Sequence, residues 1–272
     1  MLAPERREKI LEAVMCNKSV LIKDLCAMFG VTGETIRKDL SLLESEGKLM
    51  KAHGGAYVAQ GVKNQVHVSL RETLFTEEKR SIGGACARIV KNGDTIALDE
   101  STTSCFIAKS LLRHEGLTVL TNSFKVAEIF SASEQIKVIV CGGTLDVKNQ
   151  CLVGEETAGM LSHYYVDKAF VSCRGLDRRA GVTDGSEAGG YIRKCMLAHA
   201  GERYLVADHT KLGLVNFYKI CDFDAIGFFV TDCLGDPVWQ AFFEKRGIGV
   251  VSAAADEEEE GGPGRESRPR AL

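Results

Sequence analysis

The stretch VTGETIRKDLSLLESEGKLMKAHGGAYV, residues 31–58, decides how the rest of this chain is interpreted. Its apolar residues Ile36, Leu40 and Leu43 recur at helical spacing, so they share one face of a helix. Thr32 stands just before this pattern and suits the N-cap position, because its hydroxyl can accept a hydrogen bond from the first turn. These signals predict a helix over residues 33–46, beginning at Gly33.

The opposite face of this helix is polar and carries Thr35, Arg37, Lys38 and Ser41. Two interpretations are open. The residues could form an ordinary solvated face, which is the commoner outcome for such a pattern. They could instead face a DNA groove, together with Thr32 and Gly33 at the start of the helix. Arg and Lys pair with guanine edges or phosphates, and Thr meets a phosphate or a thymine methyl group.

The neighbouring segments favour the DNA interpretation. Helical patterns are predicted over residues 4–15 and 21–29, and the second ends at Gly30, a residue suited to a left-handed helix end. Two helices joined by a short turn that contains glycine are typical of a helix-turn-helix. We expect the inner face of the second helix to carry Leu21, Leu25 and Met28.

The segment KLMKAHGGAYV, residues 48–58, follows the third predicted helix, and its Gly-Gly pair suits a hairpin turn. A small hairpin after a recognition helix is a wing. We expect Lys48, Lys51 and His53 on this wing to contact the DNA backbone or a minor groove.

Composition and charge limit the classes of protein to which this chain can belong. The chain has 272 residues, 45% of them hydrophobic, and a net charge of −3. Nucleic acid must therefore be attracted by a local surface and not by the whole protein. The ten cysteines form no Cys-x-x-Cys pair, which favours reduced thiols over structural zinc or disulfides. With no apolar leader and no run of about 18 apolar residues, we expect a cytoplasmic protein without metal or cofactor.

From about residue 76 the pattern changes to short apolar runs separated by amphipathic segments, which is typical of a mainly parallel sheet covered on both faces. The predicted strands are 95–98, 117–120, 136–141, 168–173, 203–207, 226–231 and 248–252. The domains expected are a winged helix-turn-helix DNA-binding domain over 1–58, a linker over 59–75, an α/β domain over 76–254 and a disordered tail over 255–272.

The first of these strands is followed by DESTTS, residues 99–104, which opens a helix. Hydroxyl groups and free backbone N–H groups at a helix N-terminus form an anion site, well matched to a phosphate ester. A plain serine and threonine helix cap explains the same residues, and both interpretations stay open. The candidate ligands are Asp99, Ser101, Thr102, Thr103 and Ser104.

At this point the sequence resembles a known family. TIRKDLSLLESEGKLMKAHGGA, together with ERREKILEAV and VLIKDLCAMFGV, is similar to the N-terminal signature of the DeoR/GlpR family of bacterial transcriptional regulators. This resemblance implies a winged helix-turn-helix followed by a sugar-phosphate-sensing domain with a ribose-5-phosphate isomerase-like fold. Lys38 stands where the family has a second arginine, and we expect it to contact phosphate, because lysine lacks the bidentate fork.

The resemblance also implies that the loops after the strands converge on an effector site. The loop at Asp99 resembles the family's phosphate loop, with Ser101 in place of a glycine, and YLVADHTKLG has Thr210 in place of a serine. Lys211 is the cation assigned to the effector's phosphate or a sugar hydroxyl. The further effector residues implied are Asn122, Gly142, Gly143, Gly175 and Glu187.

We therefore expect a transcriptional repressor of a sugar or carbohydrate catabolic operon. It would bind double-stranded operator DNA as a homo-oligomer, a dimer or a tetramer, under the control of a phosphorylated sugar, and would not be an enzyme. The alternative is a sugar-phosphate isomerase-like enzyme that uses Asp99, Glu100 or Glu187 as a proton-transferring base. The winged head discriminates between them, because an isomerase does not need it.

Overall fold

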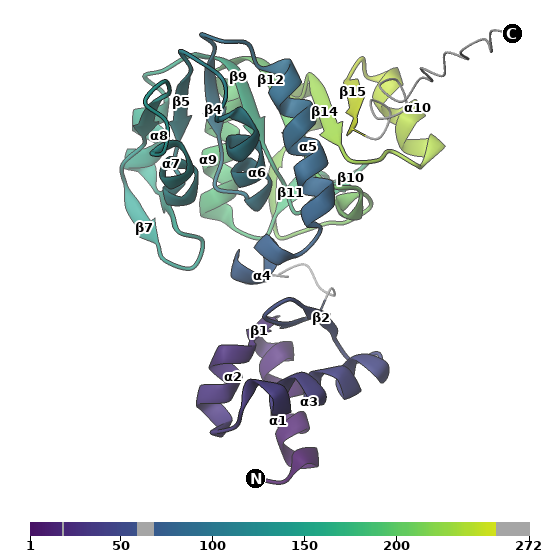
Figure 1. Ribbon diagram of the computed structural model, residues 1–272. Helices are drawn as coiled ribbons and strands as arrows, with labels where there is room; N and C mark the ends of the chain where they lie inside the picture. Colours follow the sequence, from purple (N-terminus) through teal and green to yellow (C-terminus); the bar gives the residue numbers. More distant parts are fainter. Residues whose placement is uncertain (18, 59–67, 254–272) are drawn as a thin grey trace, which may run out of the picture.

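The computed structural model describes residues 1–17, 19–58 and 68–253. A small N-terminal head and a larger α/β domain are visible in it, with the short helix α4 (Val68–Thr73) between them (Figure 1). The predicted tail over 255–272 and most of the predicted linker, residues 59–67, lie outside the described residues.

The head is a winged helix-turn-helix. Its three strands form an antiparallel sheet in the order β1-β3-β2. The three predicted helices and the hairpin are present, and β1 was not predicted. The elements of the head are α1 (Ala3–Asn17), β1 (Ser19–Leu21), α2 (Ile22–Phe29), α3 (Gly33–Ser45), β2 (Met50–Ala52) and β3 (Gly55–Tyr57).

Local signals set the ends of the two central helices. Gly30 ends α2 in the left-handed conformation, with φ of 65°, which costs glycine little. Thr32 caps α3, and its Oγ1 accepts a hydrogen bond from the Thr35 N–H at 3.4 Å. Ile36, Leu40 and Leu43 are all buried in the core of the head, as their spacing predicted.

The inner face of α2 differs from the prediction. Met28 is 63% exposed, and Leu21 belongs to β1 instead of the helix. The helix begins at Ile22, so its inner stripe runs through Ile22, Leu25 and Phe29 at helical spacing. Met28 lies next to Phe29 in the chain and is therefore turned about 100° away from that stripe.

A buried ion pair joins the first and third helices of the head. The Arg6 Nε donates to Asp39 Oδ2 at 2.6 Å, and both side chains are at most 10% exposed. Buried charges are tolerated in proteins only when they are paired, so α3 is fixed against α1 by charge as well as by apolar packing.

The large domain is built on a seven-stranded sheet in the order β15-β14-β12-β9-β4-β5-β6, with every pair parallel. All seven predicted strands are present. They are β4 (Thr95–Leu98), β5 (Thr118–Thr121), β6 (Lys137–Val140), β9 (Val166–Val171), β12 (Ala200–Val206), β14 (Phe228–Thr231) and β15 (Gly249–Ser252).

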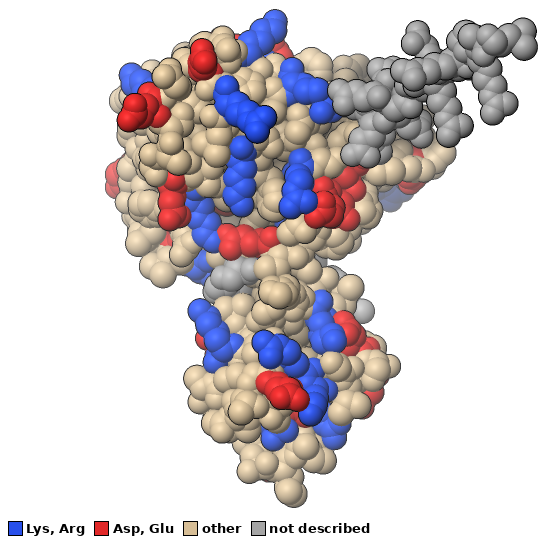
Figure 2. All heavy atoms as spheres, in the orientation of Figure 1, with Lys and Arg blue, Asp and Glu red and all other residues tan. Residues whose placement is uncertain are grey.

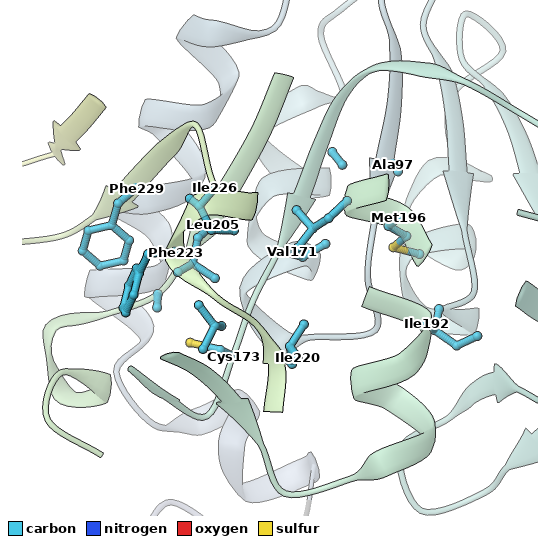
Figure 3. Packing of buried hydrophobic residues seen from close by; sticks show 14 of the residues in the cluster. Ala97, Val171, Cys173, Ile192, Met196, Leu205, Ile220, Phe223, Ile226 and Phe229 are labelled. Atoms are coloured by element: carbon cyan, nitrogen blue, oxygen red, sulfur yellow. The ribbon is translucent and has the colours of Figure 1, made fainter. Parts of the chain in front are cut away.

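Helices cover both faces of this sheet because successive strand residues point to opposite sides. Ile96 and Leu98 of β4 pack in one cluster with α5, α6 and α7, while Ala97 packs in the other cluster with α8, α9 and α10. Figure 3 shows part of the second cluster. The helices are α5 (Thr76–Ile89), α6 (Thr102–Leu111), α7 (Phe124–Phe130), α8 (Glu155–Leu161), α9 (Glu187–Ala198) and α10 (Pro237–Lys245).

Smaller elements complete the domain and were not predicted. They have no long apolar run, so hydrophobic patterning gives no signal for them. They comprise the hairpin of β7 (Thr144–Asp146) and β8 (Cys151–Val153), the sheet of β10 (Gly175–Asp177), β11 (Gly181–Asp184) and β13 (Tyr218–Cys221), and the 3-10 turns η1 (His209–Lys211) and η2 (Phe223–Ala225).

The helix α4 lies within the segment predicted to be a weakly patterned linker. Leu70 is fully buried and packs with Leu21 and Tyr57 of the head. The Thr73 hydroxyl donates to the His53 carbonyl in the wing at 3.0 Å. The C-terminal part of that segment is therefore an ordered bridge between the two domains.

Two further sequence expectations can be compared with the structure. All ten cysteines carry free thiols. Within the described ranges, none of the helices combines the length and apolar character needed to span a bilayer.

The Arg6–Asp39 pair makes a prediction about stability. Asp39→Ala leaves the buried Arg6 guanidinium without its carboxylate and should lower the free energy of unfolding of the head by about 3 kcal/mol. Hydrogen exchange of head peptides measures this change. Asp24→Ala, at an exposed position of α2, is the matched control and should stay within about 0.5 kcal/mol of the wild type. Equal protection in the two variants would contradict a structural role for the pair.

Candidate functional site

The outer face of α3 gathers the residues predicted to meet DNA. Arg37, Lys38 and Ser41 are exposed and Thr35 is half-buried. Lys38 Nζ lies 3.1 Å from Glu34 Oε1, with the two side chains 76% and 77% exposed. An exposed pair of this kind contributes little to stability, so Lys38 can exchange its partner for a phosphate at low cost.

The wing is tied to the same helix by charge. Lys51 Nζ lies 3.2 Å from Glu44 Oε2 and donates to Ser41 Oγ at 3.0 Å. The Lys51 N–H also donates to Glu44 Oε1 at 2.8 Å, and this hydrogen bond is the main reason that the pKa of Glu44 is lowered. Helix and wing therefore form one surface.

Two more wing residues and the start of α3 complete the predicted DNA set. Lys48 Nζ lies 2.7 Å from Glu46 Oε2, and His53 is exposed at the hairpin turn. Thr32 and Gly33 lie at the N-terminal end of α3. Figure 2 shows Lys and Arg side chains over the visible face of the head with carboxylates beside them. Because the surface is mixed in charge, contact with DNA would depend on where the individual cations lie.

The α/β domain contains a cavity of about 540 Å³ that reaches the head. Its floor is made by the segments that follow β4, β9 and β12, and α4 and the wing close the other side. The lining includes Ser101, Thr102 and Thr103 after β4, Ser172, Cys173 and Arg174 after β9, Asp208, Thr210 and Lys211 after β12, Arg71, Leu74 and Phe75 at α4, and Met50 and Tyr57 in the wing.

Asp99 organises the loop that begins α6. Its Oδ1 accepts from the Ser101 N–H at 3.0 Å and from the Ser104 hydroxyl at 2.5 Å, and its Oδ2 accepts from the Ser172 N–H at 2.8 Å. Ser101 caps α6 and accepts from the Ser104 N–H at 3.0 Å. With the loop held in this way, Thr102 and Thr103 lie at the cavity in the first turn of a helix.

Arg193 of α9 lies behind this loop and binds three carboxylates. It is 2.5 Å from Asp99, 2.9 Å from Glu100 and 2.8 Å from Asp184. Burial favours the neutral form of Arg193, but the carboxylates outweigh it and raise its pKa. Burial likewise opposes the charge of Asp99, but Arg193 and the serine hydroxyls lower its pKa, whereas at Glu100 burial prevails and the pKa is raised.

Three cations of the cavity lining, Lys211, Lys79 and Arg71, belong to or contact α4 and the turn that follows it. Lys211 Nζ lies 2.9 Å from both Asp208 carboxylate oxygens and 5.2 Å from the centre of the Phe75 ring. Burial lowers the pKa of Lys79 to about 8. Burial, with a contribution from the nearby Arg174, lowers the pKa of Arg71 to about 9, so that Arg71 is charged at pH 7.

Several residues predicted for the effector site do not reach the cavity. Asp99 and Ser104 are fully buried beneath the loop. Asn122 is also buried, and its amide donates to the Leu152 carbonyl at 2.9 Å. Glu187 is exposed in the first turn of α9. The cavity lining therefore contains Ser101, Thr102, Thr103 and Lys211 of the predicted effector residues, but not these four.

Two of the three predicted glycines, Gly143 and Gly175, lie where packing leaves no room for a side chain. A Cβ on Gly143 would lie 2.0 Å from Thr157 Oγ1, and a Cβ on Gly175 would lie 2.4 Å from the Leu214 carbonyl oxygen. Both positions therefore require a residue without a side chain. Gly142 lies beside Gly143 and donates its N–H to the sulfur of Met160 at 3.4 Å.

The residues that sequence reasoning missed are mostly charged. Arg71 lies in the segment predicted to be a linker, and Arg193 lies in a helix read only for its apolar spacing. Lys79 lies in α5, which was not predicted as a helix. Arg174 and Asp184 follow or end short strands, where charged residues are common in any loop. A single sequence gives no signal that would select them, because their convergence depends on the folded chain.

The solved structures that resemble this chain superimpose on it with low TM-scores. Ribose 5-phosphate isomerase A from Methanocaldococcus jannaschii has a TM-score of 0.38 and 17% identity, covering 50% of this chain and 54% of that one. The eIF2B beta subunit from Chaetomium thermophilum has a TM-score of 0.43 and 12% identity, covering 60% and 50%. At these scores neither similarity supports a functional conclusion.

Family and sequence matches are stronger. Residues 6–62 match the DeoR-like helix-turn-helix domain, and residues 74–233 match the DeoR C-terminal sensor domain. The HTH-type transcriptional regulator YulB of Bacillus subtilis is 38% identical over 252 residues, covering 93% of this chain and 97% of that protein. The HTH-type transcriptional repressor GlcR of the same organism is 30% identical over 257 residues, covering 94% and 99%. The chain belongs to the DeoR family of DNA-binding transcriptional regulators.

Proposed function

We propose that this regulator represses a sugar or carbohydrate catabolic operon and that a phosphorylated sugar, bound in the cavity at the N-terminus of α6, controls its affinity for the operator. The observation that carries the proposal is the joint presence of Thr102, Thr103 and Lys211 in one cavity of about 540 Å³. Small-molecule sites in proteins commonly have volumes of about 300–1,000 Å³.

The chemistry of the lining suits a phosphate ester. The N-terminus of α6 supplies backbone N–H groups and the positive end of a helix dipole, and two threonine hydroxyls lie in its first turn. The lining also includes five cationic side chains, Arg71, Lys79, Arg174, Arg193 and Lys211, against the carboxylates Asp184 and Asp208. Carboxylates and the Asn216 amide provide acceptors and donors for sugar hydroxyl groups.

On the DNA side, α3 supplies base contacts and the wing supplies phosphate contacts. Arg37 is exposed on α3, and its guanidinium can pair with a guanine edge in the major groove. Lys38, Lys48 and Lys51 would set the register by binding phosphates. A homo-oligomer, a dimer or a tetramer, would hold two heads at operator half-sites.

The enzyme alternative is not supported by the site. Asp99 and Glu100 are held by Arg193, and Glu187 is exposed outside the cavity. None of the three carboxylates considered as a base is therefore placed to take a proton from a ligand in the cavity.

Arg37 tests the proposed base contact. Arg37→Ala should weaken binding to the operator by about tenfold or more and reduce discrimination between sequences, because a bidentate pair with guanine is lost. Fluorescence anisotropy at fixed salt measures both effects. Lys38→Ala is the comparison. It should weaken binding to all sequences alike and reduce the slope of log affinity against log salt concentration by about one. Unchanged operator selection in Arg37→Ala would contradict the proposed contact.

Thr102 tests the proposed phosphate site. A thermal-shift screen of pentose and hexose phosphates should identify a compound that raises the melting temperature of the wild type. Thr102→Val removes one hydroxyl donor and should weaken that compound by about tenfold or more, with operator affinity retained. Thr118→Val, at the amino end of β5, is the isosteric control. Wild-type affinity in Thr102→Val would remove this loop from the effector site.

A further inference from the structure

Part of the cavity wall comes from outside the α/β sheet. Met50 and Tyr57 belong to the wing strands β2 and β3, and Arg71, Leu74 and Phe75 belong to α4 and the turn that follows it. A ligand that fills the cavity would therefore touch elements of the head as well as the loop at α6.

The wing and α4 pack tightly against each other. Leu70 is buried between Leu21 and Tyr57, and Thr73 donates to the His53 carbonyl at 3.0 Å. A Cβ on Gly55 of β3 would lie 2.8 Å from Leu70 Cδ2 and 2.1 Å from the Val20 carbonyl oxygen. The Val20 carbonyl of β1 leaves no room for a side chain at Gly55, and Leu70 lies over the same point, so α4 packs directly on the backbone of the wing.

The other side of α4 is held by the α/β domain. The Lys79 ammonium of α5 donates to the Arg71 and Leu74 carbonyls, at 2.5 Å each. Arg71 Nη2 donates to Asn149 Oδ1, between β7 and β8, at 2.9 Å. Lys125 of α7 pairs with Glu72. These contacts place the Arg71 side chain at the cavity while the opposite face of α4 packs on the wing.

We propose that the effector site is a composite of both domains, in which Arg71 of α4 binds an anionic oxygen of the phosphorylated sugar and Met50 of the wing covers its carbon skeleton. The inference rests on the proposed function and adds the part of the site that the wing and α4 supply. The planar guanidinium of Arg71 suits phosphate oxygens. Met50, with Leu74 and Val215, gives the cavity an apolar side.

In a composite site, the effector contacts the head directly. A ligand bound between Arg71 and the loop at α6 interacts with α4, and through Leu70 and Thr73 with the wing. A ligand shifts an equilibrium only through contacts that differ between the two states. An operator that requires a different wing position therefore changes the contacts at the cavity, and with them the affinity for the ligand.

Two pairs of variants of the full chain test the composite site. Arg71→Gln removes the cation that α4 contributes to the cavity, whereas Arg80→Gln removes an exposed cation of α5 that pairs with Glu77. Met50→Gln changes a wing residue at the cavity, whereas Met28→Gln changes an exposed methionine of α2 outside it. Isothermal titration calorimetry would use the pentose or hexose phosphate that stabilises the wild type most in the thermal-shift screen.

The dissociation constant should rise by about tenfold or more in Arg71→Gln and by about threefold or more in Met50→Gln, with both controls at the wild-type value. Met50 is exposed on the short strand β2, so its substitution should leave the folded core intact. Wild-type affinity in both test variants would overturn the composite site and leave the proposed function intact. Failure of the wild type to bind any of the phosphates would overturn both.

Discussion

The buried carboxylate of Asp99 is the interaction on which the arrangement of the sensor site depends. One fully buried anion accepts hydrogen bonds from the loop that begins α6, from the backbone after β9 and from Arg193 of α9. An isolated charge at this depth would be strongly unfavourable, and the hydrogen bonds and the guanidinium offset that cost. The loop is therefore fixed before any ligand arrives, which keeps Thr102 and Thr103 at the cavity.

The same cavity reaches the head through α4, and in the proposed function this contact would join the sensor to the DNA-reading head. Leu70 and Thr73 contact the wing on one side of α4, and Arg71 lies at the cavity on the other. The coupling needs no long chain of contacts, because a single short helix touches both sites. Leu70 also lies close to the backbone of Gly55 in β3, so α4 and the wing are in direct contact there.

Much of the fold could be predicted from the sequence, for identifiable reasons. The seven strands of the central sheet are short apolar runs, and burial on both faces requires such runs. Thr32 and Gly30 mark the ends of α3 and α2 by local chemistry alone. Met28 was placed inward because it lies at helical spacing from Leu21 and Leu25. Leu21 belongs to β1, however, and the inner stripe continues from Leu25 to Phe29, which is about 100° from Met28 around the helix.

The site was predicted less completely, because its charged residues meet only in the folded chain. Arg193 and Asp99 are 94 residues apart in sequence, and neither apolar spacing nor a local motif connects them. The loop over residues 99–104 was selected because its residues are contiguous, and Thr102 and Thr103 do line the cavity. Arg71 and Met50 were not selected, since each lies in an element with its own local explanation, a linker and a wing.

Reciprocal titration of the two ligands tests the central claim most directly. The dissociation constant of the phosphorylated sugar is measured with and without saturating operator DNA, and that of the operator with and without saturating sugar. A site shared by both domains predicts that each ligand changes the affinity for the other, and by the same factor. A sugar affinity that stays the same with and without bound operator would contradict it.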